Sequence, residues 1–378
     1  MIVPLARKTL LYEWRRFLPA ALSVAFSGVL LLMQAALIFG IFNTAGVYIR
    51  ASSADLWLGF PGTQSIDLGH PIDRDVEMFA RMDPNAARVE PFQWIDGNWR
   101  GPASHGNTAV FISGIDPGAR GLMFSALLRG PLRQRLREPG GVIIDQADLD
   151  KLGVQVGQTA TINGHRVRVV GEASGLRALG GVNVVASLDT ARELNDDPAT
   201  RDEATYYVVR VRDPATLEAT RARLAAVGRQ RHFDVWTRDD FARRAVRYWM
   251  FETGAGLGVL FLVGVVCVVG VIITSQTLMS AVAGSVREYA TLQALGVSFR
   301  GLSRVVLEQA GWVGALGLAV GAVVCVAFMA LARRFDVPVV LDASTALACV
   351  GLIMTIAMAS GLMALRVLRR AEPATLLR

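Results

Sequence analysis

Lysine is scarce in this sequence, and its scarcity excludes one class of protein. The 378 residues include two lysines, Lys8 and Lys151, and neither follows a glycine. A P-loop needs the lysine of G-x-x-x-x-G-K-[ST] to reach the phosphates of a bound nucleotide. The chain is therefore predicted not to be a P-loop ATPase by itself.

Histidine and cysteine are also few, with four and three residues. The histidines show no H-x-x-x-H spacing and no pairing with cysteine, so we predict no zinc site. The three cysteines, Cys267, Cys325 and Cys349, all fall within long apolar runs. The region between the first two runs has no cysteine, so it must be held together by a hydrophobic core rather than by disulfides.

Charge is absent from four long stretches. Charged residues make up 19% of the chain and hydrophobic residues 52%, which is too apolar for most soluble proteins. The runs without Asp, Glu, Lys, Arg or His are residues 17–42, 254–283, 310–332 and 345–365. Each reaches the roughly 20 residues that a helix needs to cross the hydrocarbon core, so we predict four membrane spans. The first run is too long for a signal peptide and is expected to be a retained anchor. No ionisable residue within a run marks a proton relay or ion path.

The net charge of +7 is carried by three short segments, which lie before the first run, between the second and third, and after the fourth. Together they hold eleven basic residues against four acidic ones, whereas the rest of the chain is balanced. The positive-inside rule then predicts that both termini and residues 284–309 are cytoplasmic. Arg333 and Arg334, in a short outer loop, run against this bias. Because the large soluble region is neutral, we expect no nucleic-acid binding.

Residues 49–246 show a mixed α and β pattern. Asn163-Gly164 stands between two alternating runs, which predicts a β-hairpin. Asp213-Pro214 opens an amphipathic helix. Thr237 is predicted to cap a further helix that runs without a breaker toward the second span and would carry motion to the bilayer. Four aromatic residues of this region are Trp57, Phe60, Trp94 and Trp99, and most of them are expected to pack in the core.

Glycines occur in pairs four residues apart within the spans. The run GAGLG at 254–258 superficially suggests a dinucleotide fingerprint, but no strand precedes it. The small-xxx-small pattern instead predicts close helix packing. The residues assigned to this role are Gly254, Gly258, Gly317 and Gly321.

Residues 284–309 form a charged segment between the second and third runs. Apolar residues recur there at helical spacing, namely Val286, Tyr289, Leu292 and Leu295. Gly296 is a natural C-cap, and Ser298 can start a second short helix. The pattern predicts two short amphipathic helices at the inner membrane surface, where they either bind another protein or only shield the bilayer.

The stretch from Arg287 onward resembles the signature of the FtsX-like permease family. That signature is an R-x-E-x-A-x-L-x-A-L-G type run, followed by a glutamate leading into a glycine-rich span; this chain reads REYATLQALGVSFRGLSRVVLEQAGWVGALGLAVG. The adjacent Arg287 and Glu288 depart from the usual spacing. The closing RRAEPATLLR is similar to the basic tail of many such permeases. KLGVQVGQTATINGHRVRVVGE resembles a strand pattern of the MacB-like periplasmic domain, with Gln158 where an acid is common. The chain resembles the DevC-like permeases in particular, which carry no fused ATPase.

The resemblance implies a non-catalytic permease subunit of a type VII ABC transporter in the bacterial inner membrane. A homodimer of such subunits would bind two cytoplasmic ABC ATPase subunits, and these, not the permease, would bind ATP and Mg. The segment between the second and third spans would be the coupling helix. Its implied ATPase-contacting residues are Arg287, Glu288, Tyr289, Ala290, Leu292, Leu295 and Gly296.

In this family, ATP-driven dimerisation of the ATPases moves the periplasmic domains, a process called mechanotransmission. We therefore expect efflux from the periplasm with an adaptor protein and an outer-membrane channel. Three alternatives remain open: a lipoprotein-releasing permease, a non-transporting regulator of an extracytoplasmic hydrolase, and an ectoenzyme or sensor with unrelated spans.

The expected fold is a membrane protein with four transmembrane α-helices and a large extracytoplasmic α/β domain, of the MacB-like periplasmic core type, between the first and second spans. The expected cytoplasmic parts are 1–16, 284–309 and 366–378. The expected spans are 17–48, 247–283, 310–332 and 345–365. The expected periplasmic parts are the domain 49–246 and the loop 333–344.

Overall fold

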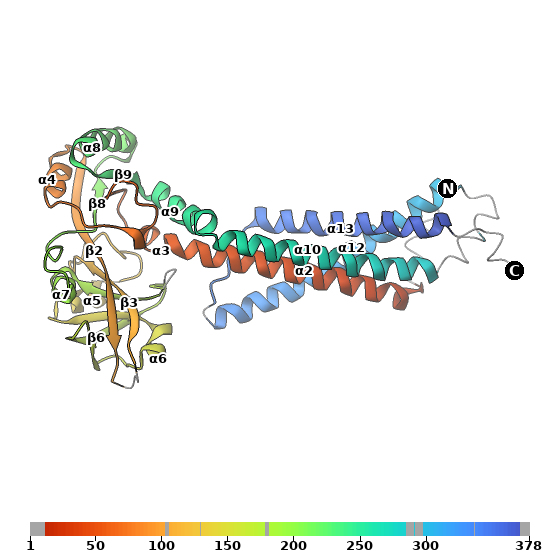
Figure 1. Cartoon of the computed structure of the whole chain (residues 1–378), viewed down its shortest axis with the longest axis horizontal. Helices are drawn as coiled ribbons and strands as arrows, with labels where there is room; N and C mark the ends of the chain where they lie inside the picture. Colours follow the sequence, from red (N-terminus) through yellow and green to blue (C-terminus); the bar gives the residue numbers. More distant parts are fainter. Residues whose placement is uncertain are drawn as a thin grey trace. The chain divides into compact units, whose positions relative to one another are not determined.

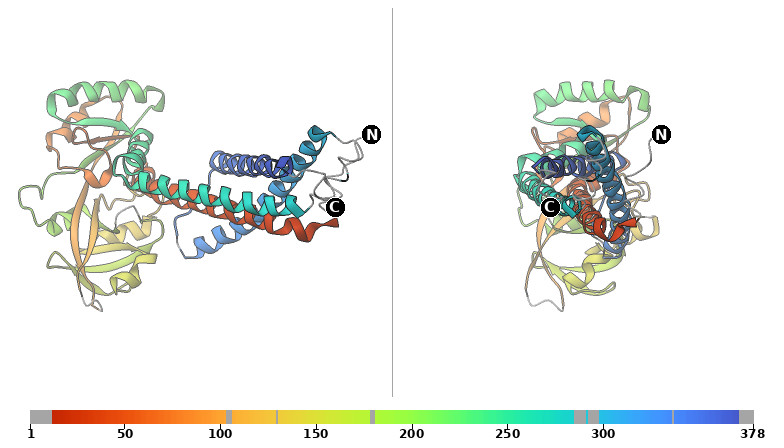
Figure 2. Two further views of the ribbon diagram at one scale, coloured as in Figure 1. Left: turned by 45° about the vertical axis from the view of Figure 1, so that its right-hand side comes forward. Right: turned by 90° about the vertical axis from the view of Figure 1, so that its right-hand side faces the viewer.

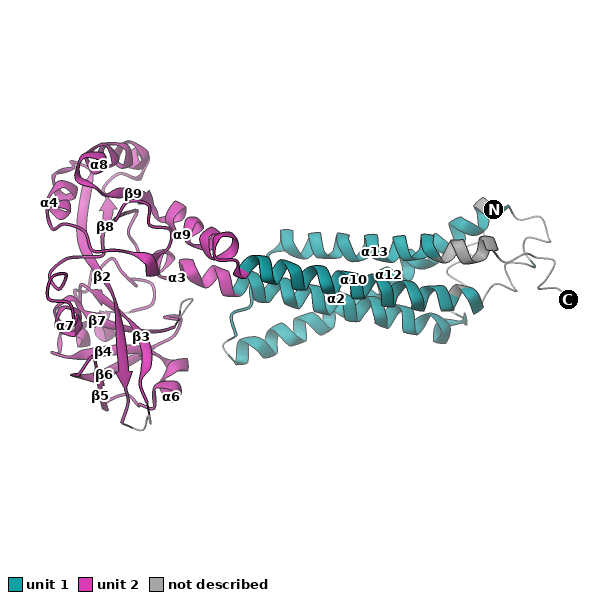
Figure 3. Cartoon of the chain, in the orientation of Figure 1, with its two compact units in different colours: residues 1–40, 256–378 teal, residues 41–255 magenta. Residues whose placement is uncertain are grey.

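The computed structural model describes residues 12–102, 106–128, 130–177, 181–284, 291, 298–335 and 337–370. The chain forms two compact units (Figure 3). Met1–Gly40 together with Gly256–Arg378 make a helical unit, and Ile41–Ala255 make an α/β unit.

Four long helices make up the helical unit (Figure 1). They are α2 (Trp14–Asn43), α10 (Ala255–Gly284), α12 (Phe299–Arg334) and α13 (Ala343–Arg370). All four are long and apolar enough to cross a membrane. The helices α2, α12 and α13 each contain a whole uncharged run, and α10 contains the second run except Gly254, because uninterrupted apolar side chains favour a helix that satisfies its own backbone hydrogen bonds in lipid.

One helix differs from the expectation. Ser298 does cap a helix, since its Oγ accepts a hydrogen bond from the N–H of Gly301 at 3.3 Å. That helix is α12, however, which continues without a break into the third span rather than ending as a short surface helix. The charged residues in its first turns are compatible with this because Arg304 and Glu308 are exposed.

The α/β unit is built on nine strands. They are β1 (Leu56–Gly59), β2 (Ala86–Arg100), β3 (Thr108–Ile115), β4 (Gly141–Asp145), β5 (Thr159–Ile162), β6 (His165–Ala173), β7 (Val182–Ser187), β8 (Tyr206–Val211) and β9 (Asp234–Thr237). The strand order is β3-β7-β4-β6-β5-β2-β8-β1-β9, and β2 also pairs with β3. Six strands, β2-β3-β7-β4-β6-β5, therefore close into a ring. The other end of β2 pairs with β8, so this long strand belongs to both parts of the sheet.

Helices flank these strands. They are α3 (Val47–Arg50), α4 (Asp75–Met82), α5 (Gly130–Gln134), α6 (Leu149–Leu152), α7 (Leu188–Leu194), α8 (Leu217–Arg231) and α9 (Arg238–Arg247). The predicted hairpin is confirmed: β5 and β6 are antiparallel, and Asn163 and Gly164 have φ of 50° and 80° between them. Both residues adopt this left-handed conformation more easily than most.

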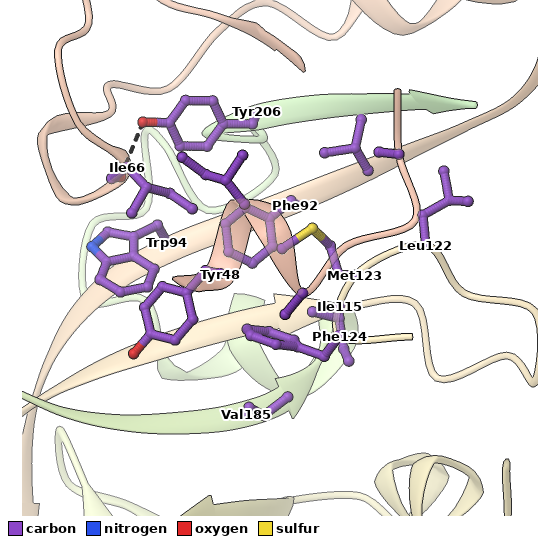
Figure 4. Packing of buried hydrophobic residues seen from close by; sticks show 14 of the residues in the cluster. Tyr48, Ile66, Phe92, Trp94, Ile115, Leu122, Met123, Phe124, Val185 and Tyr206 are labelled. Carbon is purple, nitrogen blue, oxygen red and sulfur yellow. Dashed lines mark hydrogen bonds between the residues drawn. The ribbon is translucent and has the colours of Figure 1, made fainter. Parts of the chain in front are cut away.

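Aromatic residues fill the main core of the α/β unit (Figure 4). Trp57, Trp94 and Trp99 are buried, as predicted, whereas Phe60 is 43% exposed. The Tyr206 hydroxyl donates to the carbonyl of Ile66 at 3.0 Å, so the polar end of this buried ring is satisfied. The core thus supports the unit without the help of disulfides.

Candidate coupling site and its helical support

The predicted coupling residues Arg287, Glu288, Tyr289, Ala290, Leu292, Leu295 and Gly296 lie outside the described residues. The described residues that flank them are Gly284, where α10 ends, and Ser298, which precedes α12 at Phe299.

Arg16 of α2 contacts the last residue of α10. A Cβ atom built on Gly284 would lie 2.1 Å from Nη2 of Arg16, so this guanidinium lies directly against the glycine. Glu13 forms an ion pair with Arg16 at 2.8 Å. Arg16 of α2 therefore lies against the last residue described before the predicted coupling residues.

Two of the predicted packing glycines lie against another helix. A Cβ on Gly317 of α12 would be 2.7 Å from the carbonyl oxygen of Ala21 and 2.7 Å from Cβ of Val24, both on α2. A Cβ on Gly321 would be 3.1 Å from the carbonyl oxygen of Ala25. These glycines let the backbones of α2 and α12 approach closely.

The other two predicted packing glycines behave differently. Gly254 precedes α10 and has φ of 77°, so it does not share a helical face with Gly258. Among the described residues, a Cβ on either glycine would meet no atom within 4 Å. The pairing of Gly254 with Gly258 on one helix face is thus corrected by the structure.

Further close contacts join the remaining helices, and the sequence analysis missed them. Gly361 of α13 faces Ala310 of α12, where an added Cβ would lie 2.7 Å from the Cβ of Ala310. Ser275 of α10 and Ser360 of α13 are 3.0 Å apart, Oγ to Oγ, in a buried hydrogen bond. In the sequence, these contacts are marked by serine and other small residues, which are too common in membrane spans to identify particular contact positions.

In the α/β unit, the segments next to the spans pack together. The 3₁₀ turn Thr44–Gly46 lies against α9, because a Cβ on Gly46 would be 3.3 Å from the Cβ of Ala242. Thr237 caps α9, as predicted, by accepting from the N–H of Asp240. Trp249 in the π-helical turn Tyr248–Glu252 donates to Ser65 Oγ at 3.2 Å.

The helix that begins at Thr237 does not run unbroken into the second span, which corrects the sequence-based prediction. After the π-helical turn, Thr253 and Gly254 form a bend before α10. Gly254 adopts a left-handed conformation that other residues rarely tolerate. Nothing in the local sequence distinguishes this glycine from the helical ones that follow it.

A partly buried cluster of charged residues lies in the α/β unit. Arg133 is 1% exposed and donates to the carbonyls of Asp116 and Met123, while Arg88 pairs with Asp116 at 2.7 Å and with Glu90. Burial raises the pKa of Glu90 and lowers the pKa of Arg133. These groups are used in structural hydrogen bonds, and within the described ranges no group of three His, Cys, Asp or Glu residues is placed to hold a metal ion.

The comparisons with known proteins agree with this architecture. The sequence model of the MacB-like periplasmic core domain matches residues 20–227, and that of the FtsX-like permease C-terminal region matches residues 260–373. No curated protein matches the chain.

Two solved structures are similar to part of the chain. The extracellular domain of the noncanonic ABC-type transporter YknZ from Gram-positive bacteria is 11% identical, covering 49% of this chain and 100% of that one, with a TM-score of 0.35. The periplasmic region of MacB from Actinobacillus actinomycetemcomitans is 14% identical, covering 52% of this chain and 94% of that one, with a TM-score of 0.34. Since the two family matches together span both units, the chain belongs to the FtsX/MacB-like family of ABC transporter permeases.

Proposed function

We propose that this chain is the permease subunit of a type VII, MacB-like ABC transporter that works in efflux. A separate cytoplasmic ATPase, with its own ATP and Mg, binds the segment between α10 and α12. Its movement changes the conformation of the α/β domain, which acts with a periplasmic adaptor and an outer-membrane channel. The permease acts as a homodimer in the inner membrane, with both termini in the cytoplasm.

The observation that carries the proposal is the order of features along one chain. The MacB-like match is followed by the FtsX-like match, and the charged 284–309 segment lies inside the latter. The family implies an ABC ATPase partner. This chain has no lysine in a P-loop setting, so the nucleotide-binding residues of the ATPase lie outside the sequence given.

The geometry of the helical unit supports the transmission of movement from the segment between α10 and α12. At 1.5 Å per residue, the 30 residues of α10 and the 36 of α12 extend about 45 and 54 Å. The close backbone approach at Gly317 joins α12 to α2, and the Arg16 side chain of α2 lies against Gly284 of α10. Helices packed this closely move as rigid bodies, because sliding them apart would lose dense van der Waals contact. A displacement of the coupling segment would therefore reach the far ends of the spans.

The first test is the double variant Leu292→Ser with Leu295→Ser. If these two side chains are apolar anchors in a groove of the ATPase, their loss removes about 3 kcal/mol or more of binding. This corresponds to roughly a hundredfold loss of affinity. Copurification of the ATPase with the tagged permease should fall accordingly, while the amount of inserted permease stays unchanged.

The matched control is Leu376→Ser with Leu377→Ser, the same double change in the C-terminal tail. It should leave copurification intact. Undiminished ATPase binding by the Leu292/Leu295 variant would show that the segment is not the ATPase contact.

The partners distinguish efflux from the alternatives. The tagged full-length protein, solubilised from its native cells, should bring down a P-loop ATPase together with a periplasmic adaptor. An ATPase with a cell-wall hydrolase would instead identify a regulator, and an ATPase with a lipoprotein carrier would identify a lipoprotein-releasing permease. Recovery of no ATPase would reject the proposal.

A further inference from the structure

A loop between β1 and α4 is attached to the end of α9 and to the turn that follows it. The loop consists of residues 60–70 and includes a short 3₁₀ turn. Gln64 Oε1 accepts a hydrogen bond from Nε of Arg244 at 2.8 Å. Trp249 Nε1 donates to Oγ of Ser65 at 3.2 Å. These bonds join the 60–70 loop to the segment of the chain that leads from α9 into α10 (Figure 2).

Two large apolar side chains of this loop are exposed. Phe60 is 43% exposed and Leu68 is 39% exposed. The ring centroid of Phe60 lies 5.3 Å from that of His70, so the two ends of the loop contact each other. Leu68 directly follows Asp67, whose Oδ1 accepts from Trp249 Nε1 at 3.4 Å. The exposed apolar side chains therefore belong to a loop with defined contacts, and one of them lies next to the tryptophan that precedes the second span.

The turn after α9 adds a third exposed apolar side chain and a cation. Phe251 is 57% exposed. Arg247 is exposed and forms no ion pair among the described residues. Residues four positions apart in a helical turn lie on the same side, so the ring of Phe251 and the guanidinium of Arg247 are neighbours. An aromatic ring beside a cation, just outside a span, is typical of side chains at a membrane surface.

The chain itself keeps this side of the α/β unit close to the bilayer. The first span ends at Thr44 and the second begins at Ala255. The turn after the first span lies against α9, since a Cβ on Gly46 would be 3.3 Å from the Cβ of Ala242. Ala255 is four residues after Phe251, which is at most about 14 Å of extended chain. Both connections to the spans therefore leave the α/β unit beside α9, where the loop is attached.

The interface of a bilayer takes up apolar and aromatic side chains next to cations, whereas water leaves such side chains unburied. We propose that the 60–70 loop lies on the membrane surface. Phe60, Leu68 and Phe251 contact lipid there. Arg247 pairs with the lipid phosphates. This contact holds the α/β unit to the bilayer at a point other than its two connections to the spans, and it does not depend on what the protein transports or on which ATPase binds it.

The test places a reporter on the loop in the full-length protein. Leu68→Cys and Phe60→Cys are labelled with an environment-sensitive thiol dye and reconstituted into vesicles of phosphatidylcholine and phosphatidylglycerol that contain lipids with a nitroxide near the headgroup. The natural chain, labelled in parallel, gives the signal from dye on its own cysteines, which is subtracted. We expect nitroxide lipids to quench the dye at both positions. Phe251→Cys, which the chain keeps near the bilayer, calibrates the quenching.

Met82→Cys is the matched control, because Met82 is an exposed apolar residue of α4. In β1, Leu58 packs in one hydrophobic cluster with Val76 of α4. The ring centroid of the preceding Trp57 lies 5.6 Å from that of Phe241 of α9. Successive residues of a strand point to opposite faces of a sheet, so α4 and α9 cover opposite faces (Figure 1). Dye on Met82→Cys should not be quenched.

Two further variants, each combined with Leu68→Cys, test the contacts that position the loop. Trp249→Phe keeps a ring but removes the N–H group that donates to the loop, so quenching at the loop should fall while quenching at Phe251→Cys stays. Arg247→Gln should lower the ratio of lipid-bound to free loop about fivefold, as expected for the loss of one cation at an anionic membrane surface. Arg229→Gln removes the same charge from an exposed position on α8 and should change nothing.

Three results would overturn the proposal. Quenching at Leu68→Cys no stronger than at Met82→Cys would mean that the loop stays in water. Equal effects of Arg247→Gln and Arg229→Gln would mean diffuse attraction of charge to the membrane. Protection of the loop dye from water-soluble iodide, without quenching by nitroxide lipids, would mean that a protein surface, such as a second copy of the chain, covers the loop.

Discussion

Replacing Gly317 by alanine tests how closely α12 packs on α2. The new Cβ would lie 2.7 Å from the carbonyl oxygen of Ala21 and from the Cβ of Val24. Ordinary contact between carbon atoms is about 3.5–4 Å, so the two helices must separate by roughly 0.8 Å or more at this point. Backbone atoms on the α2 side cannot rotate away, so the strain spreads along the whole helix pair.

The magnitude follows from two opposing terms. Overpacking a tight contact costs about 1–3 kcal/mol, whereas alanine is favoured over glycine in a helix by up to about 1 kcal/mol. The matched control is Gly264→Ala in α10, where an added Cβ meets no atom within 4 Å among the described residues. Since the propensity gain is common to both variants, Gly317→Ala should be less stable than Gly264→Ala by about 1–3 kcal/mol. Gly321→Ala, with its nearest contact at 3.1 Å, should fall between them.

The cysteines make the assay specific to the helical unit. All three lie in spans, and Cys325 and Cys349 are buried. A thiol-reactive dye that fluoresces on coupling therefore reports the opening of this unit and not of the α/β unit. Thermal ramps of the three variants in the same detergent should rank Gly264→Ala above Gly321→Ala above Gly317→Ala. Equal midpoints for Gly264→Ala and Gly317→Ala would refute the close approach of α2 and α12.

Three further predictions concern the α/β unit and its junction with the spans. Hydrogen bonds from Arg223 lower the pKa of Asp83. Asp83 therefore stabilises the fold above about pH 4, and this contribution is lost as the pH falls through its folded pKa. In urea titrations followed by tryptophan fluorescence, Asp83→Asn should reduce the loss of stability at acid pH. Arg133→Met leaves two buried carbonyls without their donor and should lower the unfolding free energy by about 2–4 kcal/mol in the same titration at pH 7. Gly254→Ala forces alanine into φ of 77° and should cost about 1 kcal/mol, whereas Gly258→Ala at a helical position should cost nothing.

The features that sequence predicted correctly are those with a local physical cause. Uncharged runs become helices, because lipid leaves the backbone no other partner. Asn163 and Gly164 form the hairpin turn because they accept positive φ, and Thr237 and Ser298 cap helices because their hydroxyls reach free N–H groups. In each case the residues that form the feature are themselves enough to predict it.

The missed features depend on residues distant in sequence. The ring closure of β2 joins Trp99 to Ile162 and Gln93 to Gly114, and no short window contains both members of either pair. Gly317 was recognised as a packing residue, but its partner Ala21 is almost three hundred positions away. The left-handed Gly254 looks in the sequence like the helical glycines after it, so its positive φ could not be predicted from the neighbouring residues.

The bend at Gly254 changes how motion could pass along the chain. The sequence pattern predicted one rigid helix from Thr237 into the second span, which would tilt the α/β unit by the same angle as the span. The structure has a π-helical turn and a left-handed residue between α9 and α10. The helices α9 and α10 are therefore separated by a bend and are not one continuous rigid helix. If the ATPase moves the segment between α10 and α12, the spans respond as rigid bodies, and Thr253 and Gly254 are where the direction of that motion can change.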